Sequence, residues 1–285
     1  MGLTILGSVT RDHRVSSAKP IIRWAGSKRK LLPELSNYWN QKYAKYIEPF
    51  AGSAVLFFAL SPKRACLNDL NSDLVDMYRT IRKYPEKVYR RYRSIPVSKE
   101  HYMSLRPIAF EAKNPVHRAA NFLYLNRNCF NGIYRTNKRG MFNVPFSNQR
   151  VGTIVEIETF FASATLLKRA SLSSLDFEVF LDRKVNNGDF VYLDPPYAIR
   201  NQRIFRQYGP DTFGVDDLRR LSGCLEEIDR RGAKFVLSYA DCVDAAILRK
   251  GWHCSSVSTL RNIAGFAAHR KYSKELLITN IESRQ

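Results

Sequence analysis

The chain has 285 residues, 45% of them hydrophobic, which is enough for a full hydrophobic core and excludes a disordered protein. Its 46 Lys and Arg residues outnumber 26 Asp and Glu residues, and the formal net charge of +20 predicts a surface that attracts polyanions such as nucleic acid. The five cysteines match no C-x-x-C spacing and no apolar run approaches ~18 residues, so we expect reduced thiols, a cytoplasmic location, no zinc site and no membrane span.

Short apolar runs separated by helical patterns predict a doubly wound α/β sheet. The predicted buried strands, in chain order, are residues 46–50, 65–67, 170–172, 190–193, 235–238 and 276–279. Helices are expected at residues 55–60, directly after the first strand and its turn, and at residues 216–230. The second helix has one apolar face, and Gly232 lies just past its end.

The alternation of strands and helices breaks between residues 79 and 150. This segment has 16 Lys or Arg and three acidic residues, so it holds 13 of the 20 net positive charges. It starts with helical patterns, one of them over residues 116–125, and then changes to a loop or hairpin with turn signals at Asn131-Gly132 and Arg139-Gly140. We expect an inserted smaller domain with the polyanion-binding face at residues 79–150, a main domain at residues 19–78 and 151–285, and a flexible segment at residues 1–18.

Asp194-Pro195-Pro196-Tyr197 directly follows the predicted strand at residues 190–193. An acid at the carboxyl end of a parallel strand lies where α/β sheets bind ligands. The Asp194 carboxylate and a backbone carbonyl held by the rigid proline pair can accept the hydrogens of an exocyclic amine, which favours a more tetrahedral nitrogen with a usable lone pair. Tyr197 offers a flat face for a base that has left its stack. The simpler alternative is a proline-rich turn capped by an acid.

Two further motifs follow the first two predicted strands. Glu-Pro-Phe-Ala-Gly-Ser-Ala at residues 48–54 ends a strand and opens a helix, and Gly52 permits a tight turn and the close approach of a ligand. Asn-Asp-Leu-Asn at residues 68–71 contains Asp69, which can accept hydrogen bonds from a ribose, and Asn71, which suits a helix cap. Either motif alone also fits a simple strand-to-helix connection.

A fourth motif, Arg-Trp-Ala-Gly-Ser-Lys, occupies residues 23–28. One interpretation is a helix start, with Ser27 as the cap and Lys28 in solvent. The other is that Trp24 and Lys28, beside a turn of small residues, hold a carboxylate and cover a cofactor.

Together and in this order, the four motifs resemble the Dam-type DNA adenine methyltransferases, the alpha group of amino-methyltransferases. The resemblance runs from about Pro20 to Asn280, and residues 126–135 and 139–146 look like the family's DNA-contacting hairpin and the turn before it. It implies methyl transfer from S-adenosyl-L-methionine to the exocyclic amine of adenine in duplex DNA, with the base flipped out. It also implies a Rossmann-like sheet of seven strands whose last strand, at residues 274–280, is antiparallel, with the insertion as the target-recognition domain of a monomer.

The resemblance assigns a role to each matching position. The cofactor-binding residues would be Trp24, Lys28, Phe50, Gly52, Asp69, Asp176, Phe177 and Asp194. The catalytic residues that bind the target base would be Asp194, Pro195, Pro196 and Tyr197. The DNA-binding residues would be Arg23, Arg127, Phe130, Asn131, Tyr134, Arg135 and Arg139. No metal is expected, because the sulfonium carries its own electrophile. One departure is Ala54, where many relatives have a second glycine.

The hairpin also suggests a target sequence. Phe130 would intercalate, and Arg23 and Arg135 would read guanines on either side of the methylated adenine, which favours the site GATC. The alternatives are that the aromatic residues form the core of the small domain and that Arg135 only contacts a phosphate. We also expect a loop with Asn201, Arg203, Phe205 and Tyr208 to cover the substrate channel, and Arg261, Arg270 and Lys271 to give the last hairpin of the sheet a basic edge.

Three other functions remain open at this point. Asp-Pro-Pro-Tyr also occurs in RNA adenine methyltransferases, although the hairpin favours DNA. A DNA-binding repressor that has lost catalysis would not need Asp194, Lys28 and Asp69. Methyl transfer to the amine of cytosine has the same chemistry at nitrogen.

Overall fold

The computed structural model describes residues 18–137, 139–147, 155–198, 213–262 and 270–282, without the side chains of residues 259–262 and 270–273. Residues 1–17 of the expected flexible segment lie outside this description. The same holds for the loop residues expected to cover the channel, Asn201, Arg203, Phe205 and Tyr208, and for the side chains of Arg261, Arg270 and Lys271.

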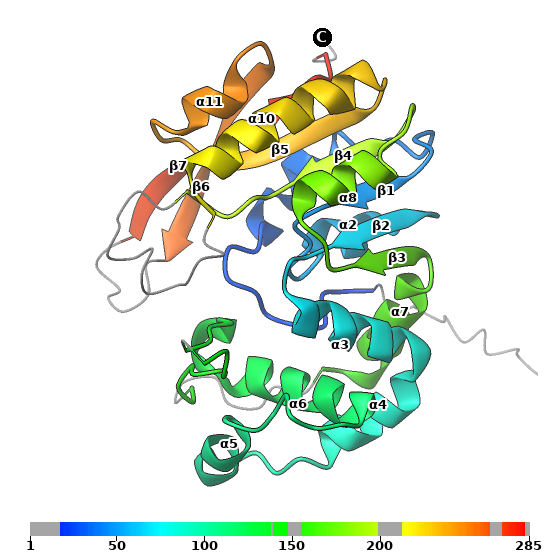
Figure 1. Ribbon diagram of the computed structural model, residues 1–285, viewed down its shortest axis with the longest axis vertical. Helices are drawn as coiled ribbons and strands as arrows, with labels where there is room; N and C mark the ends of the chain where they lie inside the picture. The colour runs from blue at the N-terminus through cyan, green and yellow to red at the C-terminus, as the bar shows by residue number, and fades with distance from the viewer. Residues whose placement is uncertain (1–17, 138, 148–154, 199–212, 263–269, 283–285) are drawn as a thin grey trace, which may run out of the picture.

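The described chain forms one sheet of seven strands in the order β3-β2-β1-β4-β5-β7-β6 (Figure 1). The strands are β1 (Tyr46–Glu48), β2 (Ala65–Asn68), β3 (Ala170–Ser173), β4 (Phe190–Leu193), β5 (Lys234–Ala240), β6 (His253–Asn262) and β7 (Arg270–Thr279). Strands β1 to β5 are parallel, and β7 runs antiparallel to both β5 and β6. The predicted Rossmann-like sheet with an antiparallel last strand is therefore confirmed.

The sequence pattern missed β6. This strand lies at the edge of the sheet and pairs with β7 alone. Its first half, His-Cys-Ser-Ser, is polar and exposed. An edge strand needs no apolar run, because solvent covers one of its sides.

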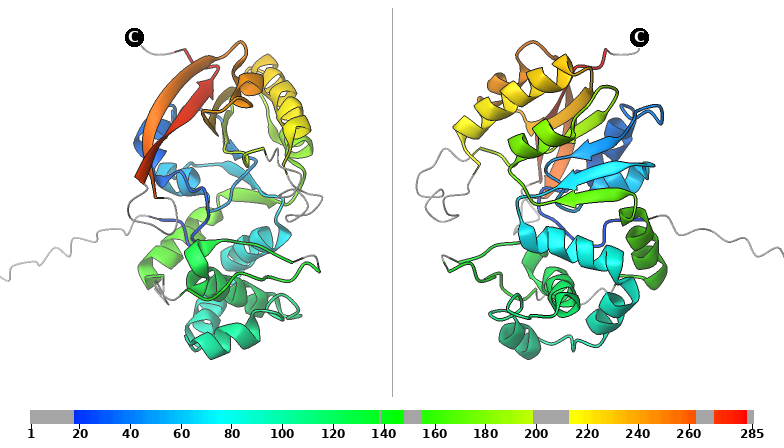
Figure 2. Two further views of the ribbon diagram at one scale, coloured as in Figure 1. Left: turned by 90° about the vertical axis from the view of Figure 1, so that its left-hand side faces the viewer. Right: turned by 45° about the vertical axis from the view of Figure 1, so that its right-hand side comes forward.

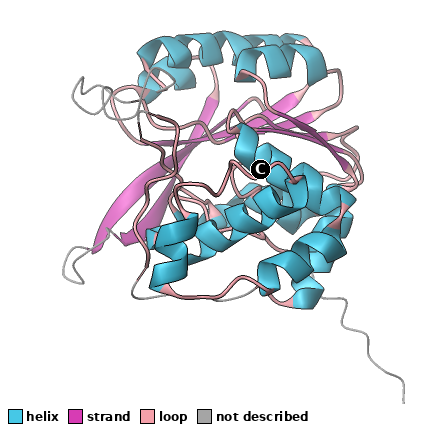
Figure 3. Ribbon diagram, turned by 60° about the horizontal axis from the view of Figure 1, so that its bottom comes forward, coloured by secondary structure: helices cyan, strands magenta, loops and turns pink. Residues whose placement is uncertain are grey.

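Neighbouring side chains along each strand enter two different cores. Tyr46 and Tyr192 belong to the core on one face of the sheet, while Ile47, Val191 and Leu193 belong to the core on the other. This period of two is the geometry of a strand buried on both faces. Helices α8 (Phe177–Lys184), α10 (Val215–Arg230) and α11 (Ala245–Arg249) cover one face, and α1 (Leu32–Ser36) and α2 (Val55–Leu60) cover the other (Figures 1 and 3).

A helical lobe, below the sheet in Figure 1, continues the core that contains Tyr46 and Tyr192. It contains α3 (Ser72–Lys83), α4 (Pro85–Arg93), α5 (Lys99–Leu105), α6 (Pro115–Asn128), the 3-10 turn η2 (Phe130–Gly132) and α7 (Ile157–Leu167). The helix predicted at residues 116–125 lies within α6. The expected domain boundary at residue 79 falls inside α3, which starts at the carboxyl end of β2 with Asn71 as its cap.

The chain after α6 folds back on itself as a hairpin at residues 129–147, which we call the 129–147 hairpin. Antiparallel bridges join Cys129 to Phe146 and Thr136 to Phe142. Asn137 accepts hydrogen bonds from Arg139 and Met141 at the tip, as expected for the predicted turn at Arg139-Gly140. Figures 1 and 2 show the hairpin projecting from the helical lobe.

Candidate active site and DNA interface

Three acidic residues meet where the central strands end. Asp194 follows β4, Glu48 ends β1, and Asp69 follows β2. Glu48 is buried and accepts a hydrogen bond from the Tyr46 hydroxyl at 3.0 Å. Burial raises the pKa of Glu48, and the charges of Asp194 and Asp69 add to the rise. The topology therefore collects carboxylates at the edge of the sheet where α/β folds bind ligands.

A buried network surrounds Asp194. Lys28 Nζ lies 2.6 Å from Asp194 Oδ1 and 3.0 Å from Glu275 Oε1 on β7. The Tyr197 hydroxyl donates to Glu275 Oε1 at 2.9 Å, and Ser238 Oγ on β5 donates to Asp194 Oδ1 at 3.2 Å. Lys28 and Glu275 are 8% and 2% exposed, so their charges depend on each other. We call these five residues the Asp194 network.

The pKa shifts in the network have opposing causes. Burial raises the pKa of Asp194, while Lys28 and the hydrogen bond from Ser238 act against the rise. Burial alone would lower the pKa of Lys28, but the carboxylates of Asp194 and Glu275 outweigh it and the pKa is raised. Lys28 therefore stays protonated, and it acts as a counter-ion and donor.

The turn after β1 is tied to the end of β2. Asp69 accepts from the backbone N–H of Gly52 at 2.8 Å and from that of Asn71 at 2.9 Å. Gly52 has φ +47°, and a Cβ on it would lie 2.7 Å from Cδ1 of Trp24. The turn predicted from the sequence therefore needs glycine, both for its conformation and for the indole that lies against it.

An aromatic cluster lies on the other side of this turn. The ring centroid of Phe50 lies 5.4 Å from that of Phe177 and 6.0 Å from that of Phe213. Asp176 caps α8 through the Glu178 N–H at 3.0 Å and forms an ion pair with Arg220 at 2.6 Å. The structure thus brings Phe50, Asp176 and Phe177 together, as the resemblance implies.

Trp24 and Tyr134 belong to an aromatic stack between the sheet and the lobe. The Trp24 ring is stacked on Tyr134 at 6.0 Å and on Phe122 at 6.5 Å between centroids. The Tyr134 hydroxyl donates to Asp73 Oδ2 at 2.7 Å, and Phe142 is 4% exposed beside it. For Tyr134, the geometry favours the alternative that the aromatic residues form the core of the lobe.

Arg23 and Arg127 join the N-terminal segment to the end of α6. The Arg23 guanidinium donates to the carbonyls of Asn126 at 3.1 Å and Cys129 at 3.3 Å, and it also contacts the carbonyl of Arg127. The Arg127 guanidinium donates to the carbonyl of Ile21. Arg23 therefore satisfies carbonyls that the end of α6 leaves without partners, and Arg127 satisfies a carbonyl of the N-terminal segment. In this arrangement backbone carbonyls engage both guanidinium groups.

Other predicted DNA-contacting residues lie on the surface of the 129–147 hairpin. Phe130 is 43% exposed, which is unusual for a phenylalanine, and Asn131 beside it is exposed with φ +54°. Arg135 is exposed and donates from Nε to Asn143 Oδ1 across the hairpin at 2.8 Å. Arg139 is exposed at the tip. These four side chains can reach a bound polymer without a change in the core.

The sequence patterns missed two members of the Asp194 network and one neighbouring acid. Glu275 directly precedes the apolar run of the last predicted strand, and an acid next to such a run was the available signal. Ser238 ended a predicted strand, and only the strand order brings it to Asp194. Glu48 lies in the predicted strand at residues 46–50, and nothing in the local pattern marks it as a buried acid of the site.

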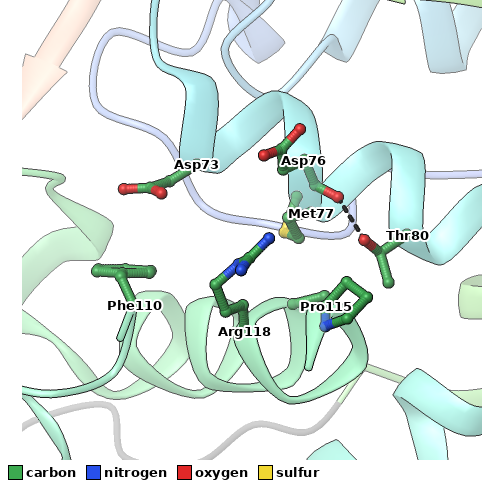
Figure 4. A pocket seen from close by; sticks show the side chains of 8 residues that line it. Asp73, Asp76, Met77, Thr80, Phe110, Pro115 and Arg118 are labelled. Atoms are coloured by element: carbon green, nitrogen blue, oxygen red, sulfur yellow. Dashed lines mark hydrogen bonds between the residues drawn. The ribbon is translucent and has the colours of Figure 1, made fainter. Parts of the chain in front are cut away.

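A pocket between α3 and α6 lies outside this site (Figure 4). Its lining residues are Asp73, Asp76, Met77, Thr80, Phe110, Pro115, Arg118 and Ala119. Thr80 Oγ1 donates to the backbone carbonyl of Asp76 at 2.7 Å, and Asp73 is the partner of Tyr134. The pocket contains none of the predicted site residues. In the described part of the chain, no helix is long and apolar enough to span a bilayer.

Comparison with known proteins gives one family and several relatives. The family model described as D12 class N6 adenine-specific DNA methyltransferase matches residues 24–263. Type II methyltransferase M1.LlaDCHI of Lactococcus lactis subsp. cremoris is 32% identical over 271 residues, which cover 92% of this chain and 95% of that protein. Type II methyltransferase M.MjaIII of Methanocaldococcus jannaschii is 33% identical over 286 residues, covering 92% and 99%. The DNA adenine methylase of Escherichia coli (strain K12) is 28% identical over 270 residues, covering 91% and 94%.

Proposed function

The chain belongs to the D12 class of N6 adenine-specific DNA methyltransferases, and on this basis we propose that it methylates adenine at a specific site in duplex DNA. S-adenosyl-L-methionine would be the methyl donor, and the target base would be flipped out of the helix. The observation that carries the proposal is the carboxylate of Asp194 at the end of β4, held by Lys28 and Ser238. It lies where a flipped base would meet the sheet edge.

Asp194 would accept the hydrogens of the adenine amine. In the described part of the chain, Lys28 and Ser238 both donate to Oδ1, which leaves Oδ2 and the rigid backbone of Pro195-Pro196 to face the amine. The raised pKa of Asp194 also suits it to take the proton that the nitrogen loses when the methyl group joins it.

Tyr197 would stack on the flipped base. Its hydroxyl is held by Glu275 and its ring edge meets Tyr239, with 5.4 Å between centroids. A ring held at both positions offers a preorganised face for the base. Exposed Phe130 would fill the gap that the base leaves in the duplex.

The residues near Gly52 fit the methyl donor. The half-buried carboxylate of Asp69 can accept hydrogen bonds from ribose hydroxyls. Phe50 and Phe177, beside Asp176, offer apolar surface for the adenine ring of the donor. When bound, the donor supplies a sulfonium methyl group that is electrophilic without a metal. Lys28 is engaged by Asp194 and Glu275, so we propose that it positions the catalytic carboxylate.

Incorporation of a labelled methyl group into duplex DNA tests the proposal. Wild-type protein should label duplex DNA and leave structured RNA unlabelled. Asp194→Ala should nearly abolish labelling and retain duplex binding, while Asp182→Ala, an exposed acid on α8, should behave as wild type. Preferential labelling of RNA would favour the RNA enzyme, and binding without labelling by the wild type would favour the repressor. Near-normal turnover of Asp194→Ala would contradict the role of Asp194.

We further propose GATC as the target site, on the family resemblance of the 129–147 hairpin and the exposed position of Arg135. The enzyme would act as a monomer on DNA in the cytoplasm, either in the nucleoid or in a phage-infected cell. DNA from cells that express it can be digested with enzymes that cut only methylated or only unmethylated GATC. Methylated adenine elsewhere with GATC unmodified would show that the site is wrong and leave the family unaffected.

A further inference from the structure

Helix α4 and the last residue of α3, Lys83, carry a row of exposed cations. The exposed basic side chains between residues 83 and 93 are Lys83, Lys87, Arg90, Arg91 and Arg93, against one exposed acid, Glu86. We call these five basic residues the α4 stripe. The opposite side of the helix is anchored, because Val88 and Tyr92 are buried and the Tyr89 hydroxyl donates to the carbonyl of Val155 at 3.1 Å.

The stability of α4 does not explain this row. The helix dipole favours the arginines of the last turn, but Lys87 lies in the first turn, where a cation is disfavoured. Lys87 stands three and four residues before Arg90 and Arg91, and like charges at these spacings repel each other. The spacing of Lys87, Arg90 and Arg91 therefore adds a repulsion that an anion outside the chain would relieve.

Two of these cations converge on one aromatic ring. Lys83 Nζ and Lys87 Nζ lie 5.1 Å and 5.4 Å from the ring centroid of Tyr84. Across the described residues, none of the ion pairs joins a carboxylate to any member of the α4 stripe. The stripe is thus a concentrated positive surface, with five cations beside the single acid Glu86 and no ion pair to them among the described residues.

The α4 stripe is separated from the predicted recognition surface. Figures 1 and 2 place α4 on the side of the helical lobe away from the 129–147 hairpin. Helix α6 lies between them, and its 14 residues span about 21 Å. A duplex segment held at the hairpin and Asp194 is therefore not the segment that α4 faces.

We propose that the α4 stripe is a second, sequence-independent docking surface for duplex DNA, which binds phosphates of a segment other than the one held at the 129–147 hairpin and Asp194. The inference rests on the proposed function only for its choice of polyanion. Duplex DNA carries one phosphate charge per about 1.7 Å of axis, so a helix of about 14 Å meets several of them. A second site on the same DNA molecule raises occupancy only when the DNA is long enough to reach both surfaces.

The test compares two triple variants on two lengths of DNA. The first is Lys87→Gln/Arg90→Gln/Arg91→Gln, and the control removes three exposed cations on α8 and α10, Arg183→Gln/Arg219→Gln/Arg230→Gln. Binding is measured with a duplex of about 12 bp, little more than one helical turn, and one of about 150 bp, one persistence length. Both contain the same methylation site.

The α4 variant should lose affinity for the long duplex on the order of tenfold, and its log–log salt slope there should fall by about 0.9 for each lost phosphate contact. The affinity of the α4 variant for the short duplex should stay unchanged, and so should the affinity of the control variant for both duplexes. The α4 variant should unfold at no lower temperature than the wild type, because the repulsion between its cations is relieved. The proposal would be overturned if the α4 variant lost affinity equally for both lengths of DNA, or for neither. It would also be overturned if the variant kept its affinity for the long duplex and lost affinity for an acidic protein. Because these are binding measurements, a failure of methylation by the wild type would be a separate result.

Discussion

Lys28 is a buried cation held between two carboxylates. Removing a charge from water is unfavourable unless partners replace the solvent, and here Asp194 and Glu275 do so at 2.6 and 3.0 Å. The same contacts place the Asp194 carboxylate and, through Glu275, the hydroxyl of Tyr197. At the scale of single residues, the site is therefore one coupled electrostatic unit.

This coupling predicts opposite pH shifts in two variants. Asp194 accepts hydrogens from the amine only when ionised, so kcat should fall at low pH, and burial raises its pKa and places that fall above the usual range of an aspartate. Ser238→Ala removes a hydrogen bond that lowers the pKa, so the acid limb should move to higher pH. Glu275→Gln removes a like charge that raises the pKa, so the limb should move to lower pH, with the amide oxygen still able to accept from Tyr197.

The measurement is the pH profile of kcat at saturating DNA and cofactor. Ser222→Ala, which removes a hydroxyl bonded to the carbonyl of Ile247 on α11, is the matched control and should leave the acid limb in place. Shifts in the same direction for Ser238→Ala and Glu275→Gln would contradict the assignment of this limb to Asp194.

At the scale of elements, the residues at which helices begin and end determine the geometry of the site. Helix α2 opens at Ala54, which has φ +49° and is fully buried. That conformation is left-handed, where residues other than glycine are strained by about 1–2 kcal/mol. The position where many relatives have glycine is thus a strained alanine in this chain.

Ala54→Gly should leave the free energy of unfolding nearly unchanged. Relief of the strain offsets two losses. One is the burial of a methyl group, and the other is the greater conformational entropy of the unfolded chain with glycine, which costs about 0.4–1 kcal/mol. Ala162→Gly, inside α7, has no strain to relieve and should destabilise by about 1 kcal/mol. Urea unfolding measures both, and equal losses in the two variants would disprove strain at Ala54.

Arg23 and Arg135 are expected to have different roles, because Arg23 donates to carbonyls at the end of α6 and Arg135 is exposed on the 129–147 hairpin. Arg23→Ala removes charged hydrogen bonds to buried carbonyls, so it should lower the free energy of unfolding by about 2 kcal/mol and weaken binding to all DNA sequences alike. Arg135→Ala should leave stability unchanged and relax discrimination at one base position by about 1–3 kcal/mol.

Thermal unfolding and competition binding with single-base variants of GATC measure these effects. Loss of specificity in Arg23→Ala at full stability would restore Arg23 as a base reader. Uniform weakening in Arg135→Ala would make Arg135 a phosphate contact.

At the scale of the whole molecule, much of the positive charge in the insertion is used internally. Among the described residues, six arginines between residues 79 and 150 donate to backbone carbonyls, and these are Arg79, Arg82, Arg106, Arg118, Arg127 and Arg135. Their acceptors are carbonyls of the edge strand β3 and of irregular segments, so these guanidinium groups are only partly available to a polyanion. Net charge therefore overstates the number of DNA contacts.

Binding to duplex DNA should still depend steeply on salt, with a log–log slope of about −0.9 per phosphate contact. The slope should correspond to fewer contacts than the 16 basic residues of the insertion. Filter binding over a range of salt concentrations gives the slope. A flat response would show that the insertion is not the DNA face, and a slope equivalent to 16 or more contacts would show that the internally bonded arginines also reach phosphates.

The sequence by itself determined the strands, the family and the separate motifs. Apolar runs at β1, β2, β4, β5 and β7 are long enough to mark buried strands, and the tetrapeptide from Asp194 to Tyr197 marks the end of β4. These signals are local, because burial on both faces and a rigid proline turn each leave a mark in consecutive residues. The polar edge strand β6 left none.

Only the tertiary structure decided which residues meet. Ser238 meets Asp194 because β5 adjoins β4, and Glu275 meets Lys28, the partner of Asp194, on β7, which adjoins β5. This strand order leaves no trace in the local pattern. The tertiary structure also decided that Tyr134 and Arg23 serve the joint between sheet and lobe, since a buried aromatic ring or arginine and an exposed one look alike in the sequence. Burial and partner choice depend on residues distant along the chain, and the fold alone brings them together.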